Sequence, residues 1–141
     1  MTMNKKSKEP VVPKVRNPVP GLLVMCESFL DGAKRDIAEW KEKFEKDPAY
    51  ALSWSRGTFH SAAVLRVYGQ VVSKLRAGTP IKALYTGYLA MLSSSAGQSY
   101  RSSSPASNMM ADAEVAVYAN VVDTLGALVE TEEKFKAQEN G

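Results

Sequence analysis

A stripe of apolar residues recurs at helical spacing through the first third of the chain. Its members are Leu22, Cys26, Phe29, Ala33, Ile37, Trp40 and Phe44. Because successive members are three or four residues apart, they share one face of an α-helix, whereas a strand would require alternation at every second residue. The stripe predicts a helix over residues 21–45 with this face buried. At the end of this helix, Trp40 and Phe44 are expected to be largely buried.

Capping signals predict three more helices. Asp47-Pro48 and Thr79-Pro80 each place a capping side chain before a proline, which favours the first turn of a helix. Gly57 and Gly69 predict a kink or a close crossing inside the second helix. The expected helices cover residues 48–76, 80–92 and 108–136. Gly78 is the stop signal after the first of these, and Ser107 is the expected cap of the last.

These elements predict an all-α, four-helix bundle-like domain over residues 21–141. A chain of 141 residues has the length of one domain, and no segment alternates as a half-buried strand does. Residues 1–20 predict a basic extended arm, because their four prolines, including Pro18 and Pro20, disfavour a helix. The Ser-rich segment 93–107 predicts a mobile loop before the last helix.

The charged residues are separated along the chain. Residues 51–101 contain six Lys or Arg residues and no carboxylate, whereas residues 102–133 contain six carboxylates and no Lys or Arg. A surface of one sign selects partners of the opposite sign. The middle of the chain is therefore expected to bind a polyanion or an acidic surface.

The basic segment predicts a nucleic-acid-binding site. In helical projection, one side of the second helix carries Arg56, His60, Arg66, Gln70 and Lys74. The apolar residue Val67 falls on the same side. Further cations follow in the third helix and the loop, where Tyr100 offers a ring for base stacking. The residues expected to contact nucleic acid backbone are Arg56, His60, Arg66, Lys74, Lys82 and Arg101.

Two other interpretations of the charge pattern remain open. The acidic last helix could lie against the basic helix of the same chain, or against the basic helix of another copy, which would generate rings or filaments. Asp112, Asp123 and Glu130 share one side of the last helix, whereas Glu114 projects toward its apolar side. Glu114 is therefore expected to be partly buried and paired with Arg or Lys of the second or third helix.

No catalytic, metal-binding or phosphate-binding motif is present in the sequence. His60 is the single histidine and has no acidic residue within one helical turn, so a surface role is expected for it. Cys26 lies on the first apolar stripe and is expected to be a buried, inert thiol. The sequence thus predicts a non-enzymatic protein with no cofactor, no metal and no small-molecule substrate.

Location is predicted from cysteine content and hydropathy. A lone cysteine cannot form an internal disulfide, which fits a reducing compartment, and no apolar run is long enough to span a membrane. A cytoplasmic protein is expected.

In size, helix content and charge layout, the chain is similar to the small helical subunits of CRISPR-type effector complexes. Those subunits are non-catalytic and line the path of the guide–target duplex and the displaced strand. The chain is equally similar to small helical phage and plasmid proteins that bind a host complex. No motif identifies a family, and neither resemblance supplies a residue to carry over.

The function expected first is a non-catalytic subunit that contacts the backbone of RNA, single-stranded DNA or a hybrid duplex within an assembly. The alternative is a homo-oligomeric or host-protein-binding adaptor that uses complementary acidic and basic faces.

Overall fold

The fold is all-α. A computed structural model of the chain describes residues 17–96 and 104–140, and within these ranges it contains helices and no strand. The helices are α1 Val19–Lys46, α2 Pro48–Leu52, α3 Ser55–Arg76, α4 Ile81–Ala96 and α5 Pro105–Asn140. The predicted fold class is confirmed. The expectations for residues 1–16 and 97–103 lie outside the described residues.

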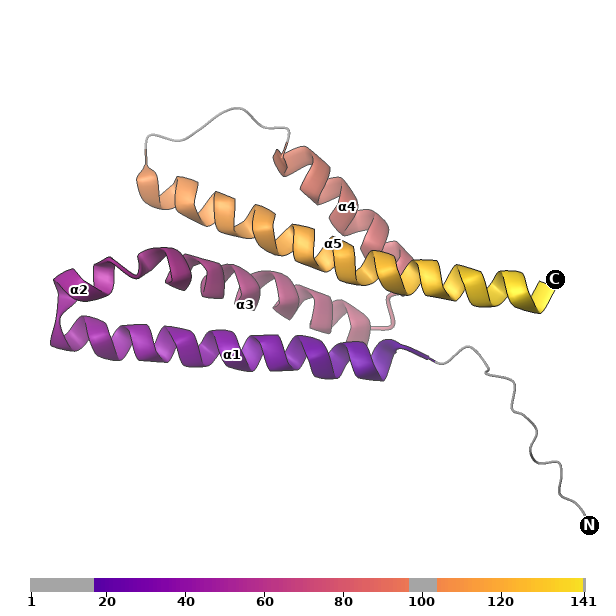
Figure 1. Cartoon of the computed structure of the whole chain (residues 1–141), viewed down its shortest axis with the longest axis horizontal. Coiled ribbons are helices and arrows are strands. Elements are labelled where there is room, and N and C mark those ends of the chain that lie inside the picture. The colour runs from indigo at the N-terminus through magenta and orange to yellow at the C-terminus, as the bar shows by residue number, and fades with distance from the viewer. Residues whose placement is uncertain (1–16, 97–103, 141) are drawn as a thin grey trace, which may run out of the picture.

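The four long helices lie side by side in a row (Figure 1). The order across the row is α1, α3, α5 and α4, and each helix packs against the next. α1 runs antiparallel to α3, α3 and α5 run in the same direction, and α4 runs antiparallel to α5 (Figure 1). α1 and α4 therefore lie at opposite edges, and the bundle is open.

The hydrophobic core lies mainly between the two central helices. Val67 and Val71 of α3 are buried there with Val117, Val121 and Leu125 of α5. The two edge helices complete this core from opposite sides. α1 contributes Leu22 and Cys26, and α4 contributes Leu84 and Tyr88.

The helix expected over residues 48–76 is divided into α2 and α3. Asp47 caps α2 as predicted, because its carboxylate accepts a hydrogen bond of 3.2 Å from the Tyr50 N–H. The break lies at residues 53–54 rather than at Gly57 or Gly69. At the break, Ser55 Oγ donates a hydrogen bond of 2.6 Å to the Leu52 carbonyl. Serine hydroxyls that bond to nearby backbone groups compete with the helical pattern, which explains the position of the break.

Prolines begin two helices earlier than the sequence patterns suggest. α1 starts at Val19, so Pro20 lies in its first turn, where a missing N–H leaves no helical bond unmade. α5 starts at Pro105, and Ser104 Oγ accepts a hydrogen bond of 3.3 Å from the Ser107 N–H. The expected cap at Ser107 was therefore wrong, and Ser104-Pro105 repeats the arrangement of Asp47-Pro48.

The helices flanking the Ser-rich segment are also longer than expected. α4 continues to Ala96 and α5 begins at Pro105, so parts of the predicted loop 93–107 are helical. α3 ends before Gly78 as predicted, and Gly78 adopts a left-handed φ of 91° that favours glycine.

The expectation that Trp40 and Phe44 are largely buried was wrong. Phe44 is 38% exposed and Trp40 is half-buried. α1 has no buried residue after Ala33. Its last turns and α2 extend beyond the start of α5 (Figure 1). The end of the apolar stripe therefore faces the start of α3 but is not covered by α5. In the part of the chain that the structure describes, no helix has the length and apolar character needed to cross a membrane.

Candidate functional site

The predicted basic face of α3 is partly occupied by α5. Arg56, His60, Arg66 and Lys74 are all exposed. On the same side of the helix, however, Ala63 and Val67 are fully buried. Because α3 has packing partners on two sides, a face that looks polar in projection also carries apolar positions that α5 covers. The cations thus surround a helix–helix contact and do not form a continuous basic surface.

Two of the predicted phosphate-binding residues pair with carboxylates of α5. Arg66 Nη1 lies 2.7 Å from Glu114 Oε2, and Lys82 Nζ lies 3.5 Å from Glu133 Oε2. The Glu114 side chain is 19% exposed and that of Arg66 is 61% exposed. The pairing expected for Glu114 is confirmed. Both pairs retain solvent contact, so they neutralise charge and contribute little to stability.

Lys74 lies against an aromatic ring of α4. Its ammonium is 5.4 Å from the centroid of the Tyr88 ring, and the Tyr88 hydroxyl donates a 3.4 Å hydrogen bond to Gln70 Oε1. Burial raises the pKa of Tyr88 to about 12, so this hydroxyl keeps its proton and remains a donor at neutral pH. Lys74 is thus held on the α3–α4 contact, away from Arg56 and His60.

Arg56 and His60 are the predicted contact residues whose side chains have no partner among the described residues. Within residues 17–96 and 104–140, neither one forms an ion pair or a side-chain hydrogen bond. Both lie near the start of α3. Arg101 lies outside the described residues. Of the five predicted residues that the structure describes, Arg56 and His60 lie one turn apart on α3 and form no ion pair.

A cluster of apolar side chains at the same end of the molecule was not predicted as a site. We call it the aromatic end and define it by Trp40, Phe44, Tyr50, Leu52 and Trp54. Four of its members are exposed, with Tyr50 at 51%, Leu52 at 57% and Trp54 at 50%. The sequence signal is the apolar segment of residues 50–54, which follows the Asp47-Pro48 cap directly.

The aromatic end is ordered by specific contacts. The Trp40 indole N–H donates a 2.8 Å hydrogen bond to the carbonyl of Ala51, which is buried. Trp40 and Phe44 stack with ring centroids 5.2 Å apart, and Tyr50 and Trp54 contact at 5.9 Å. α2 is therefore fixed to α1, and the exposed rings are held in defined positions.

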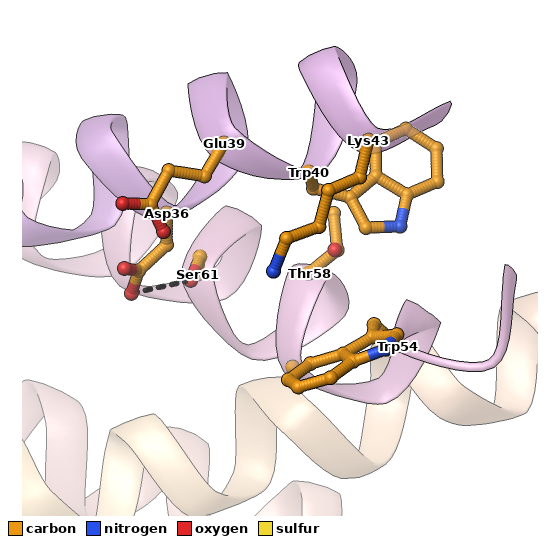
Figure 2. Close-up of a pocket in the computed structure, with 8 residues that line it drawn as sticks. Asp36, Glu39, Trp40, Lys43, Trp54, Thr58 and Ser61 are labelled. Atoms are coloured by element: carbon orange, nitrogen blue, oxygen red, sulfur yellow. Dashed lines mark hydrogen bonds between the residues drawn. The ribbon is translucent and has the colours of Figure 1, made fainter. Parts of the chain in front are cut away.

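A pocket of about 240 Å³ opens beside this cluster (Figure 2). Trp40 and Lys43 of α1 line it together with Trp54, and the Lys43 ammonium lies 4.5 Å from the centroid of a Trp54 ring. Asp36 and Glu39 also line the pocket, and Ser61 Oγ donates a 3.4 Å hydrogen bond to Asp36 Oδ2. The pocket thus combines aromatic surface, two carboxylates and one ammonium.

A larger groove of about 530 Å³ separates α1, α3 and α5. Phe29, which is exposed and contacts Tyr68 edge to face at 5.1 Å, lines this groove with His60 and Asp123. His60 forms no ion pair with the other described residues that line this groove.

The buried titratable groups are structural. Cys26 is completely buried as predicted, and burial together with the nearby Glu27 carboxylate raises its pKa to about 11. A thiol of this kind is a poor nucleophile. Across the described ranges, no group of three or more His, Cys, Asp or Glu side chains is placed to hold a metal ion.

Comparison with protein-family models, with curated proteins and with solved structures gives no match for the chain.

Proposed function

We propose that the chain is a non-catalytic helical adaptor that binds a partner protein through its aromatic end. The observation that carries this proposal is the joint exposure of Tyr50, Leu52 and Trp54, each at least half exposed. Exposed apolar patches on soluble domains mark interaction sites, and Trp and Tyr are enriched among the residues that dominate binding energy.

Charge at this end favours a protein over a nucleic acid. Residues 34–56 contain six Lys or Arg residues and five carboxylates, so the net charge is close to zero. Nucleic acid binding depends on an excess of cations that replace counterions along the phosphates. A mixed polar rim around exposed aromatic rings is instead typical of protein interfaces.

Order at the aromatic end supports the same function. The hydrogen bond of Trp40 to Ala51 and the Tyr50–Trp54 contact fix the rings before any partner arrives. A pre-ordered surface loses less side-chain entropy on binding, which leaves more of the contact energy as affinity.

The test compares three tagged versions of the full chain in cross-linked extracts of its native host. They are the natural chain, the Leu52→Ser/Trp54→Ser double variant, and Val24→Ser. Val24 is a matched control because it is 68% exposed and lies near the start of α1, away from the aromatic end. A protein recovered with the natural chain and with Val24→Ser but lost with the double variant is the expected result. Equal recovery with all three overturns the proposal.

Light scattering on the purified chain distinguishes a foreign partner from a second copy. If the natural chain self-associates and the double variant is monomeric, the partner is the chain itself. If neither version self-associates, the partner is a different protein.

Nucleic acid backbone contact is the second candidate function. Its support is that Arg56 and His60 are exposed and unpaired among the described residues, and that the exposed Trp54 precedes them. A cation beside an exposed indole suits phosphate contact combined with base stacking.

A further inference from the structure

The pocket at the aromatic end already holds a cation. The Lys43 ammonium lies 4.5 Å from the Trp54 ring centroid, within the distance at which an aromatic face attracts a positive charge. No carboxylate of the described residues forms an ion pair with Lys43. The indole is thus the group that holds the ammonium in this position.

Two carboxylates line the same pocket without a cationic partner. Asp36 accepts a hydrogen bond from Ser61, and within the described ranges neither Asp36 nor Glu39 is in an ion pair. In Figure 2 their carboxylate groups lie together on one side of Lys43, and Trp40 lies on the other. A cation that entered between Trp54 and these carboxylates would interact with both, whereas Lys43 reaches only the ring.

We infer that this pocket is a binding site for a basic side chain, Lys or Arg, of the partner protein. Lys43 is the internal occupant that this side chain displaces. The inference rests on the proposed adaptor function and names the group that the partner inserts. A volume of about 240 Å³ is below the usual range for small-molecule sites and suits one side chain.

The direct test uses short peptides and observes the two indole N–H signals of the chain by NMR. The chain has two tryptophans, so the Trp54→Phe variant assigns both signals. The probe is acetyl-Gly-Gly-Lys-Gly-Gly-amide, and its control replaces Lys by norleucine, which has the same stem without the charge. The Lys peptide is expected to shift the Trp54 signal saturably, and the norleucine peptide is expected to leave it unchanged.

Removal of the internal occupant gives a second measurement. Lys43→Met keeps the apolar stem and deletes the competing ammonium, so the Lys peptide should bind about two- to fivefold tighter, the factor that an exposed cation–π contact represents. Lys41→Met is the matched control, because Lys41 is exposed on the same helix and does not line the pocket. Glu39→Gln should weaken binding of the same peptide.

Three results would overturn the inference. Equal shifts with the Lys and norleucine peptides would show that the pocket selects apolar groups. Unchanged or weaker binding to Lys43→Met would show that Lys43 does not occupy the site. Binding of tetramethylammonium more than tenfold tighter than the Lys peptide would identify a small quaternary ligand instead. These results leave the adaptor function intact, since that function depends on the loss of a recovered partner in Leu52→Ser/Trp54→Ser.

Discussion

Trp40 connects α1 to α2 through a single hydrogen bond. Its indole N–H donates to the Ala51 carbonyl, and its ring stacks on Phe44 without being fully buried. Trp40 therefore acts mainly as a link between α1 and α2, and less as a core side chain. Loss of the link would free the aromatic end while leaving the α3–α5 core in place.

Trp40→Phe keeps an aromatic ring and removes the hydrogen bond. The free energy of unfolding is expected to fall by about 0.5–1.5 kcal/mol, the net contribution of one such bond. Chemical denaturation followed by circular dichroism measures this change. Trp54→Phe serves as control, because the Trp54 indole N–H forms no hydrogen bond with any described residue. Replacing Trp54 should therefore lower the free energy of unfolding by less. An equal cost for both variants would contradict the role given to Trp40.

Cys26 makes stability depend on alkaline pH. Burial raises its pKa from 9.0 to about 11, so the folded state retains a proton that the unfolded state releases. This contribution to stability is fully present below pH 9 and is lost as the pH rises from 9 to 11. Tyr68 acts in the same direction at higher pH, since its pKa rises from 10.0 to about 12. Urea unfolding at pH 8, 9, 10 and 11 measures how the free energy of unfolding falls as the pH rises. If this free energy does not change below pH 10 in Cys26→Ser, the loss between pH 9 and 10 in the natural chain is due to the thiol.

α4 packs closely on α5 at Gly126. A Cβ at Gly126 would meet Cε1 of Tyr85 at 3.0 Å. Gly126→Val should therefore displace α4 and lower the free energy of unfolding by about 1–3 kcal/mol, as overpacking does. Gly69→Ala is the contrasting variant, because its Cβ would meet open space inside α3, and it should gain about 0.4–1 kcal/mol. Thermal melts should show a lower melting temperature for Gly126→Val and a higher one for Gly69→Ala. Stabilisation by Gly126→Val would contradict the close contact.

The sequence predicts where the helices lie along the chain better than it predicts which helices pack against each other. Apolar spacing and cap–proline pairs are local signals, and they placed the long helices within a few residues. The break at residues 53–54 escaped prediction because it depends on serine hydroxyls bonding to nearby carbonyls. Projection also placed Arg56 and Lys74 on one side of α3. It could not show that α5 covers Val67 on that same side, because a single helix does not reveal which neighbour approaches it.

The open row determines where the candidate site lies in the whole molecule. α5 runs alongside α3 and begins short of the α1–α2 end, so α5 does not cover the aromatic rings there (Figure 1). From sequence, Trp40 and Phe44 belonged to an apolar stripe that looked like core along its whole length. Their exposure depends on how far another helix extends, and no local pattern encodes that length.

The second candidate function is tested on the whole chain with the Arg56→Glu/His60→Glu double variant, because these are the two exposed side chains that support it. If nucleic acid is the partner, a labelled single-stranded RNA should bind the natural chain with an affinity that falls as salt rises. The double variant should bind more weakly by a similar factor for every RNA sequence, because phosphate contacts carry no base information. Fluorescence anisotropy at three salt concentrations measures both effects. The control Lys41→Glu/Lys46→Gln changes the net charge by the same amount on α1, and equal weakening by the two variants would point to net charge alone.

The two edges of the row share no helix contact of substance, since α1 and α4 are separated by α3 and α5. Free-energy changes at sites that share no partner are additive, whereas those at neighbouring sites are coupled. A variant that combines Trp40→Phe and Gly126→Val should therefore lose the sum of the two single losses, within about 0.5 kcal/mol. The same separation means that amide hydrogen exchange in α4 should not slow when a partner occupies the aromatic end, whereas exchange in residues 34–52 should. The α1 edge and the α4 edge would then respond independently to substitution and to binding, although both edges pack on the same central pair of helices.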